Sequence, residues 1–317
     1  MRYSYPDSIL SPSDEAQEER SQILNSKIRL AHSLTDVIQN KLSLPAGVTI
    51  SRAISKILLP PLNDSLICPT NLGFDLVISK NDGQNYYYDG QYEPGTLHVM
   101  SKCLRANDTF VDAGASIGQM SFFAANIIGK KGMVLSFEPH VQRYSSLVRG
   151  IELNQMKNVV AYNSGLGEIE ETLKLYTNRV SPSLISNEKK ITDFEEVRIM
   201  QLDSVLEQER KKDVRMIKID VEGFELKVLK GATRLLSSAN APIICMEHER
   251  FDKNPLINLY FLQKINNYKF FNLKQAKGRV SKLVQIKTPE KVRLHDNVFC
   301  FLEKDIQDLS SSGLFSS

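Results

Sequence analysis

One stretch of this 317-residue sequence reads Thr109-Phe-Val-Asp-Ala-Gly-Ala-Ser-Ile-Gly-Gln-Met-Ser-Phe-Phe-Ala-Ala125. A short apolar run ends at Asp112, glycines follow at Gly114 and Gly118, and apolar residues resume from Met120 with helical spacing. A strand, a glycine turn and a helix form the first unit of a nucleotide-binding α/β sheet, where the ligand approaches the backbone N–H groups at the start of the helix. A side chain in place of either glycine would hold the ligand away from those groups.

The acidic residue in front of the glycines indicates which ligand the turn binds. Asp112, Gly114 and Gly118 give the pattern Asp-x-Gly-x-x-x-Gly, whereas dinucleotide-binding turns read Gly-x-Gly-x-x-Gly. A pyrophosphate needs uninterrupted N–H groups and no carboxylate at the strand end, but a cationic amino group suits a carboxylate there. The pattern therefore favours a ligand such as S-adenosyl-L-methionine, whose amino-acid end carries an amino group. A tight turn that binds nothing is the alternative.

The composition is that of an ordinary globular protein, with 42% hydrophobic and 24% charged residues. The net charge of +3 is too small to indicate a nucleic-acid partner. We find neither a signal peptide nor an apolar run that could span a membrane, and we therefore expect a cytoplasmic protein. The four cysteines lack the CxxC spacing of zinc sites, and Cys245 and Cys300 lie in apolar runs that are typical of buried thiols.

The first hundred residues predict an extension ahead of the α/β part. Residues 1–20 are polar and are expected to be flexible. Apolar residues then recur with helical spacing over 21–44, and Pro45 ends this helix. The helix could pack on the rest of the chain or on a second subunit, which would make a homo-oligomer.

A short helix and a hairpin are predicted next. The segment Phe74–Ser79 alternates apolar and polar residues, Asn81-Asp-Gly83 marks a turn, and Tyr86–Tyr88 resumes the strand. A helix over Leu97–Leu104 precedes the first strand of the α/β part.

From residue 109 strands and helices alternate, which predicts a mainly parallel sheet. The segments Leu173–Tyr176 and Val197–Leu202 predict a hairpin-like insertion, with a polar loop around 181–193. The further predicted strands are Met133–Phe137, Val159–Tyr162, Val214–Ile219, Pro242–Met246, Tyr268–Leu273 and Val298–Glu303.

Polar side chains follow the ends of these strands, which is where ligands bind in such sheets. Glu138 could accept two hydrogen bonds from a ribose diol, in NAD as well as in S-adenosyl-L-methionine. Asn163 and Ser164 could meet the adenine, or they could only form the turn before Gly165.

A second acidic motif follows the fourth parallel strand. Asp220 and Glu222 would point the same way if the strand continued, with Asp220 near the transferred methyl group and the acceptor hydroxyl. Lys218 lies in an apolar run and needs a buried partner, which Asp220 or Glu247 could supply. The motif lacks the Asn/Asp-Pro-Pro-Tyr of amide and amine methylation and the Pro-Cys of cytosine-ring methylation, so oxygen is the favoured acceptor.

Glu247 and His248 follow the fifth parallel strand. His248 is the obvious candidate for a general base because the unperturbed pKa of imidazole is near neutral, and Asp220 or Glu222 could take that role instead. His248 could equally be a structural residue. These four side chains could also form an oxygen-rich metal site, but we predict that no metal is bound.

A basic segment, residues 274–293, precedes the last predicted strand. Such a run is typical of a solvated face, or it would attract an anionic acceptor such as a nucleotide- or lipid-linked sugar. It has no interleaved aromatic residues for base stacking, so nucleic acid is disfavoured. Its basic residues are Lys274, Lys277, Arg279, Lys282, Lys287, Lys291 and Arg293, against the single acid Glu290.

Together these motifs resemble the FkbM family of S-adenosyl-L-methionine-dependent methyltransferases. The resemblance covers about residues 86–303 and depends on the order and spacing of several segments. They are Tyr92-Glu-Pro-Gly, Phe110-Val-Asp-Ala-Gly-Ala-Ser-Ile-Gly, Phe137-Glu-Pro, Leu202-Asp203, Ile217-Lys-Ile-Asp-Val-Glu-Gly-Phe-Glu, Leu229-Lys-Gly-Ala and the acid Glu247.

The resemblance implies a class I methyltransferase fold, a Rossmann-like α/β fold whose mainly parallel seven-stranded sheet has helices on both faces and an antiparallel strand near one edge. We therefore expect a helical and hairpin extension at 21–85, a methyltransferase domain at 86–305 and a flexible tail at 306–317. The implied reaction is O-methylation of a small molecule or glycan, such as a sugar of a polysaccharide or glycolipid, or a polyketide-type hydroxyl. Asp220, Glu222, Glu247 and His248 are the expected catalytic residues. The expected cofactor-binding residues are Glu93, Asp112, Gly114, Ala115, Ser116, Gly118, Glu138, Asn163 and Ser164.

Other classes of protein remain open at this stage. An NAD-linked oxidoreductase would need a turn that accommodates a pyrophosphate, which Asp112 disfavours. A catalytically inactive cofactor-binding or scaffold protein would use the N-terminal helix and the basic segment to bind a partner, although the acidic strand ends argue against it. A protein or nucleic-acid methyltransferase is a further alternative among enzymes.

Overall fold

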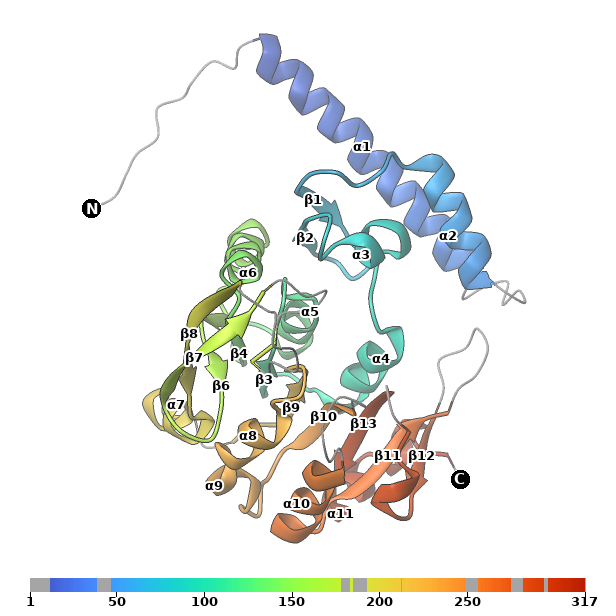
Figure 1. The fold of residues 1–317 in the computed structure, drawn as a ribbon. Coiled ribbons are helices and arrows are strands. Elements are labelled where there is room, and N and C mark those ends of the chain that lie inside the picture. Colours follow the sequence, from blue (N-terminus) through green and yellow to red (C-terminus); the bar gives the residue numbers. More distant parts are fainter. Residues whose placement is uncertain are drawn as a thin grey trace.

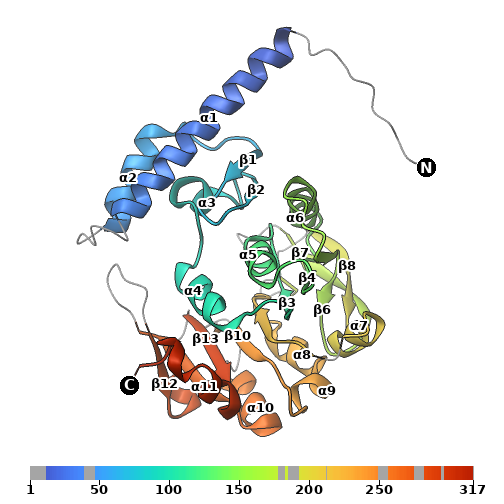
Figure 2. The same cartoon turned by 180° about the vertical axis from the view of Figure 1, so that it is seen from behind.

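The structure is a computed structural model, which describes residues 12–38, 47–177, 183–184, 193–211, 213–248, 256–274, 282–293 and 296–316. Its centre is a large twisted sheet with helices on both faces (Figure 1). A pair of long helices lies beyond one end of this body, and Figure 2 shows the same separation from behind.

The large sheet contains eight strands in the order β12-β11-β13-β10-β9-β3-β4-β5. The five strands from β10 to β5 are parallel, while β13 runs antiparallel to both β10 and β11. The predicted mainly parallel sheet is therefore confirmed. The strands are β3 (Thr109–Ala113), β4 (Met133–Phe137), β5 (Val159–Tyr162), β9 (Met216–Ile219), β10 (Ile243–His248), β11 (Lys269–Leu273), β12 (Leu283–Ile286) and β13 (Asp296–Phe301).

The strand order reverses between β3 and β9, because the chain moves from β3 outward to β4 and β5 and later returns to the other side of β3. Such a reversal leaves a crevice at the carboxyl ends of the strands, where ligands bind in open α/β sheets. The glycine turn after β3 lies at this reversal.

Strand β12 is the eighth strand, where seven were expected. It consists of the short apolar run Leu283-Val-Gln-Ile286 inside the basic segment 274–293, and this run was not predicted to be a strand because charged residues flank it. Leu283 is fully buried and pairs with Leu273 of β11. Burial of this run outweighs the charges around it, because the lysines on either side can still reach water.

Both faces of the sheet are covered because successive strand residues point to opposite sides. On β3, Phe110 packs with helices α4 to α6, and Val111 packs with helices α7 to α10. The first group consists of α4 (Pro94–Cys103), α5 (Gln119–Ile128) and α6 (Val141–Leu153). The second group consists of α7 (Leu202–Gln208), α8 (Glu225–Lys230), α9 (Thr233–Leu236) and α10 (Leu256–Asn266).

A small three-stranded sheet follows β5. Strands β7 (Glu171–Tyr176) and β8 (Phe194–Met200) pair antiparallel, which confirms the predicted hairpin-like insertion, and β6 (Gly165–Leu166) pairs with β8. Most of the polar loop predicted around 181–193 lies outside the described residues.

The first helix of the N-terminal extension begins earlier than predicted. Helix α1 (Pro12–Asp36) begins at Pro12 instead of Ser21, so residues 12–20 are helical where flexibility was expected. Proline is favoured at the first helical position and acidic residues in the first turn, and the sequence has both there. The predicted end of the helix, near Leu44, lies outside the described residues. The extension continues with α2 (Gly47–Leu58), β1 (Leu66–Pro69) and β2 (Asp75–Ile78).

The strand predicted over Tyr86–Tyr88 is wrong, because these residues belong to helix α3 (Gln84–Asp89). Tyr87 is buried and its hydroxyl donates to the backbone oxygen of Pro60, so tertiary packing overrides the strand preference of tyrosine. Gly90 ends the helix at φ +77°, and a Cβ there would lie 2.4 Å from Oδ1 of Asn71.

The expected flexible tail is also wrong over the residues that the structure describes. Helix α11 (Glu303–Asp308) is followed by buried Leu309 and Leu314, and the N–H of Leu283 donates to the backbone oxygen of Leu314 at 2.8 Å. The ring of Phe315 packs on the rings of Phe271 and Phe301. The described end of the chain is therefore fixed to strand β12 by a backbone hydrogen bond and to β11 and β13 by an aromatic cluster.

The structure also bears on the cysteines and on membrane-spanning segments. Cys245 and Cys300 are buried free thiols, as expected, and Cys68 and Cys103 are too. Within the part of the chain that the structure describes, we find no helix with the length and apolar character needed to cross a membrane.

Candidate active site

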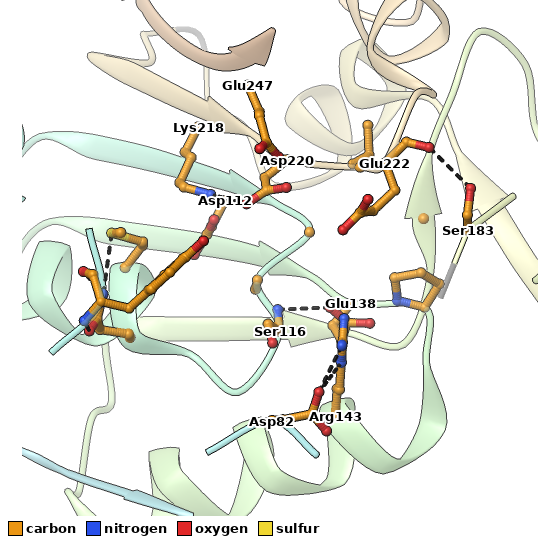
Figure 3. A pocket seen from close by; sticks show the side chains of 18 of the residues that line it. Asp82, Asp112, Ser116, Glu138, Arg143, Ser183, Lys218, Asp220, Glu222 and Glu247 are labelled. Atoms are coloured by element: carbon orange, nitrogen blue, oxygen red, sulfur yellow. Dashed lines mark hydrogen bonds and ion pairs between the residues drawn. The ribbon is translucent and has the colours of Figure 1, made fainter. Parts of the chain in front are cut away.

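A cavity of about 920 Å³ opens at the carboxyl ends of β3, β4, β9 and β10 (Figure 3). This volume is typical of a site for a small-molecule ligand. Eight of the predicted site residues line it: Asp112, Gly114, Ala115, Ser116, Glu138, Asp220, Glu222 and Glu247.

The glycine turn forms the floor of the cavity. Gly114 has φ +84°, and a Cβ at this position would lie 1.9 Å from the backbone oxygen of Asp220. Gly118, the N-cap of α5, has φ +100° but does not line the cavity. Only glycine combines such backbone angles with this close contact, so the two strand ends can touch directly through Gly114.

Asp112 lines the cavity, and its carboxylate is buried. Its Oδ2 accepts a hydrogen bond of 2.6 Å from the hydroxyl of Ser121, while Oδ1 is buried without a hydrogen-bond partner among the described residues. Burial raises the pKa of Asp112, and the Lys218 ammonium opposes this shift. A buried acceptor without a partner is costly, and a ligand that donates to it would remove that cost.

Two backbone N–H groups hold the carboxylate of Glu138 in place. Its Oε2 accepts from the N–H of Ser116 at 2.7 Å, and its Oε1 accepts from the N–H of His140 at 2.9 Å. Burial nevertheless raises the pKa of Glu138 to about 7. Each carboxylate oxygen can accept a second hydrogen bond, so the group can still bind a diol.

Asn163 and Ser164 do not line the cavity. The side-chain amide of Asn163 instead donates to the backbone oxygens of Glu138 and Pro139, which fixes the chain after β4. Ser164 is buried beside them, and the cavity wall is formed by the next two residues, Gly165 and Leu166. The prediction placed the wall two residues too early because it assumed that the strand-end side chains turn toward the ligand.

Lys218, which is buried, and Asp220, which is half-buried, form an ion pair next to the glycine turn. The Nζ of Lys218 lies 2.8 Å from Oδ2 of Asp220, so Asp220 is the partner that Lys218 was predicted to need. Burial would raise the pKa of Asp220, but the Lys218 ammonium and a hydrogen bond with Glu247 hold it below its ordinary value. Asp220 is therefore ionised at neutral pH.

Two further carboxylates share this end of the cavity. In Figure 3 the side chains of Asp220 and Glu247 lie next to each other, and Glu222 points into the cavity from the loop after β9. Glu222 has φ +54°, and its backbone oxygen accepts from the hydroxyl of Ser183 at 3.0 Å. The strand ends before Glu222, so it reaches the cavity through a tight turn and not through strand alternation.

His248 is only 1% exposed and does not line the cavity. It follows Glu247 directly on β10, and adjacent strand residues point to opposite faces of a sheet. Ile244 and Met246, which share the face of His248, pack in the core beneath helices α7 to α10. The prediction that His248 acts as the base therefore conflicts with its position. Among the described residues, no group of three or more histidine, cysteine, aspartate or glutamate side chains is placed to hold a metal ion.

Glu93 lies behind the cavity and does not line it. It is the N-cap of α4 at φ +49°, and burial raises the pKa of its carboxyl group while Lys218 lowers it. Its position next to Lys218 makes it part of the charged surroundings of the ion pair and not a ligand contact.

The sequence reasoning missed a whole wall of the cavity. Residues 81–92 supply Asp82, Tyr86 and Tyr92 to the lining, and Asp82 forms an ion pair of 2.7 Å with Arg143 of α6. The three consecutive tyrosines Tyr86–Tyr88 were the available signal for this wall, but they were assigned to a strand and not to a ligand site. None of the five described basic residues of segment 274–293 lines the cavity, and Lys277 and Arg279 lie outside the described residues.

The fold and this site define a class of protein. A mainly parallel sheet with an antiparallel strand inserted near one edge, a glycine turn after the first strand and an acidic residue after the second are the features of S-adenosyl-L-methionine-dependent methyltransferases of class I. The chain belongs to the FkbM methyltransferase family, since the family model described as "Methyltransferase FkbM domain" matches residues 112–270. This confirms the resemblance seen in the sequence and argues against the NAD-linked oxidoreductase.

Curated relatives agree with this assignment. "Methyltransferase 1" of Beauveria bassiana (strain ARSEF 2860) is 29% identical over 147 residues, which cover 39% of this chain and 59% of the relative. "Methyltransferase sdnD" of Sordaria araneosa is 31% identical over 160 residues, covering 40% and 61%. "Hexuronic acid methyltransferase AglP" of Haloferax volcanii is 24% identical over 155 residues, covering 48% and 61%. The chain thus spans about three-fifths of the length of these relatives.

Solved structures are more distant. A methyltransferase FkbM from Methylobacillus flagellatus KT is 19% identical, with a TM-score of 0.42 over 69% of this chain and 52% of that chain.

Proposed function

We propose that this protein transfers a methyl group from S-adenosyl-L-methionine to a hydroxyl oxygen of a small molecule or glycan. The observation that carries the proposal is the pairing of two acidic groups in one cavity, the partnerless Oδ1 of Asp112 and the backbone-held carboxylate of Glu138. They suit the two ends of this cofactor, an ammonium group and a ribose diol.

The residues of the floor fit the cofactor in chemistry as well as in place. Asp112 would accept from the ammonium group, the backbone of Gly114 and Ala115 would lie against the amino-acid part, and Glu138 would accept from the ribose. Gly165 and Leu166 offer a small apolar surface beside Glu138 for the adenine. When bound, the cofactor supplies an electrophilic methyl group on a sulfonium centre.

The three carboxylates at the other end of the cavity would handle the acceptor. Asp220 stays ionised beside Lys218 and can accept a hydrogen bond from the acceptor hydroxyl, which orients the oxygen. Glu222 would take the proton as the oxygen becomes nucleophilic, since it lines the cavity and His248 does not, whereas Glu247 carries a proton itself when it donates to the ionised Asp220. Holding the two reactants in line in a confined cavity would account for most of the rate.

Several observations support oxygen as the acceptor atom. The loop after β9 reads Asp220-Val-Glu222 and has neither the proline–tyrosine segment of amine methylation nor a cysteine nucleophile. Carboxylates accept hydrogen bonds from hydroxyl groups, which orients the acceptor and prepares its deprotonation. The relative from Haloferax volcanii carries the name of a hexuronic acid methyltransferase, which adds support for a carbohydrate acceptor.

The test combines cofactor binding with methyl transfer. Isothermal titration should show binding of S-adenosylhomocysteine and none of NAD. A labelled-methyl assay against glycans, nucleotide sugars and small alcohols, with and without a chelator, should then identify the acceptor. Binding of NAD alone would overturn the proposal. Binding of S-adenosylhomocysteine without transfer to any acceptor would favour the inactive cofactor-binding protein.

A further inference from the structure

Lys218 is a buried cation on the strand that separates the cofactor end of the site from the acceptor end. It lies on β9, where its Cα pairs with that of Asp112 in β3 on one side and that of Cys245 in β10 on the other. Neighbouring strands lie about 4.8 Å apart, and residues paired directly across parallel strands point to the same face of the sheet. The side chain of Lys218 therefore starts beside that of Asp112, the proposed partner of the cofactor ammonium group.

The ammonium group of Lys218 serves more than one carboxylate. Its Nζ lies 2.8 Å from Oδ2 of Asp220, and the side chain of Lys218 is only 5% exposed. In Figure 3 this nitrogen points toward both Asp112 and Asp220. The negative charge of Glu93, the N-cap of α4, acts on it as well. One positive charge thus serves three carboxylates from different parts of the chain.

A lysine in this position is costly unless its charge is used. Burial alone would lower the pKa of Lys218, but the three neighbouring carboxylates raise it well above its ordinary value. Desolvation of an ammonium group is so unfavourable that a single ion pair often fails to offset it, and an apolar side chain of similar volume would pack equally well. The charge of Lys218 therefore indicates a role in the site.

Asp112 depends on Lys218 for its charge. The hydroxyl of Ser121 donates to its Oδ2 at 2.6 Å, which fixes the orientation of the carboxylate but brings no charge. Burial raises the pKa of Asp112, the Lys218 ammonium is the largest effect that lowers it, and the charge of Asp220 raises it further. Without Lys218, Asp112 would take up a proton.

Two further charged groups lie one contact away. Glu247 is hydrogen-bonded to Asp220, and Arg143, the other cation in the described lining of the cavity, forms an ion pair of 2.7 Å with Asp82. Neither of them is among the main influences on the carboxylate of Asp112. Lys218 is therefore its main source of positive charge.

We propose that Lys218 is a positioning residue for the cofactor, which keeps Asp112 ionised so that this carboxylate accepts a charge-assisted hydrogen bond from the ammonium group of S-adenosyl-L-methionine. The inference rests on the proposed methyltransferase function. Charge-assisted hydrogen bonds are roughly twice as strong as neutral ones, so a protonated Asp112 would hold the cofactor weakly. Because Asp220 shares the same ammonium group, Lys218 also couples the cofactor end of the site to the acceptor end.

The groups around Lys218 decide how this arrangement responds to pH. Cys245 and the phenol group of Tyr92 keep their protons near neutral pH, because burial raises the pKa of both, that of Tyr92 to about 12. Asp112 and Glu93 are buried carboxyl groups whose pKa Lys218 lowers, so their charge depends on it. The titratable groups that face Lys218 are Glu93, Asp112, Asp220, Cys245, Tyr86 and Tyr92.

The experiment measures the binding of S-adenosylhomocysteine to the full chain by isothermal titration in a double-mutant cycle. At a pH of about 7.5 the Lys218→Met variant should raise the Kd about tenfold or more, because Asp112 is then protonated. In the Asp112→Asn background the same substitution should change the Kd by less than about threefold, since the carboxylate through which Lys218 acts is gone. Lys218→Arg keeps the charge and should retain most of the affinity.

A pH series separates this role from a purely structural one. Raising the pH from about 7 to about 8.5 should return the charge to Asp112 in Lys218→Met, so the Kd of this variant divided by that of the unaltered protein should fall severalfold. Glu138 titrates in both proteins, so its effect cancels in the ratio. Loss of packing alone would leave the ratio constant.

The matched control is Lys227→Met. Lys227 lies on α8 outside the cavity lining, where it forms an exposed ion pair of 2.6 Å with Glu168, and its replacement should leave the Kd unchanged. Thermal unfolding checks that each variant is folded. Lys218→Gln, which keeps a neutral donor for Asp220, replaces Lys218→Met in the cycle if the latter does not fold.

The outcomes separate this inference from the proposed function. An unchanged Kd in Lys218→Met, an equal loss in the Asp112→Asn background, or a Kd ratio that does not vary with pH would each overturn the inference while the methyltransferase assignment stands. Failure of the unaltered protein to bind S-adenosylhomocysteine would overturn the proposed function instead.

Discussion

The floor and the wall of the cavity are built in different ways. The floor is set by the backbone, because Gly114 touches the carbonyl of Asp220 and two N–H groups hold Glu138. The wall of residues 81–92 is held by side chains, through Gln119 to Tyr92 and Arg143 to Asp82. Backbone geometry tolerates few sequences, whereas side-chain clamps can be exchanged. The comparison predicts that damage to the floor abolishes cofactor binding and that damage to the wall changes acceptor binding alone.

The largest effect is expected for Gly114→Ala. A Cβ would meet the Asp220 carbonyl at 1.9 Å in a left-handed backbone, so the turn has to move and the site for S-adenosylhomocysteine is lost. Thermal unfolding with and without the ligand should show no stabilisation by it. Gly313→Ala is the control, because Gly313 has φ +73° and ψ 8° but no neighbour within 4 Å, and should cost only about 1 kcal/mol. A ligand-dependent shift that persists in Gly114→Ala would contradict this account of the floor.

Removing the charge of Asp112 should have the next largest effect. Asp112→Asn keeps the shape but loses a charge-assisted hydrogen bond, so the Kd for S-adenosylhomocysteine should rise by about 10- to 100-fold. Isothermal titration measures this, with the exposed Asp64→Asn as the control. An unchanged Kd would show that Oδ1 of Asp112 does not contact the ligand.

Cofactor binding should also depend on pH through Glu138. Its pKa of about 7 means that the carboxylate, which accepts from the ribose, is mostly protonated at pH 6, so the affinity should fall about tenfold from pH 8 to pH 6. The folded state holds this proton more tightly than the unfolded state, so Glu138 lowers the free energy of unfolding as the pH rises from 4.5 to 7. Glu138→Gln should bind more weakly, and its affinity should be flatter over this range. The same slope in both proteins would assign the titration to another group.

A smaller effect, confined to acceptor binding, is expected when the ion pair that holds residues 81–92 to helix α6 is removed. Asp82→Asn breaks the half-buried pair with Arg143 and should raise the KM for the acceptor a few-fold while the Kd for S-adenosylhomocysteine stays within twofold. The control is Glu170→Gln, which breaks an exposed pair with Arg198 and should change neither constant. An equal loss in both constants would mean that floor and wall do not act separately.

The smallest effect is expected for His248. Since it lies on the opposite face of β10 from Glu247, His248→Gln should keep kcat within twofold of the unaltered enzyme. Any loss should be in thermal stability, because the side chain is buried. A loss of kcat by about 100-fold or more, with a normal melting temperature, would restore His248 as a candidate base.

The same division explains what could be predicted from the sequence. The floor follows from local rules, in which an apolar run, a carboxylate and two glycines fix a strand, a turn and a helix, and so Asp112, Gly114 and Glu138 were found. The wall depends on contacts between distant segments, such as His32 with Tyr87, which no local pattern contains. Tyr86–Tyr88 therefore looked like a strand, and tertiary packing made it a helix.

Two other errors have equally specific causes. Glu247 and His248 were both predicted to face the site because they end the same strand, although adjacent side chains of a strand point to opposite faces of the sheet. The apolar run of β12 was overlooked because charges surround it, and its burial depends on Leu273 and Leu314, which follow from pairing across the sheet. Periodicity predicts which residues are apolar, but it does not predict which distant segment covers them.

The contact between Gly114 and the Asp220 carbonyl has a consequence for the catalytic cycle. Because the two loops touch without a side chain between them, one cannot retreat from the ligand unless the other moves too. The two loops at the base of the site therefore form one rigid unit. Exchange of the cofactor would then depend on the opposite wall, where the side-chain contacts of Asp82 and Gln119 can break without unfolding the sheet.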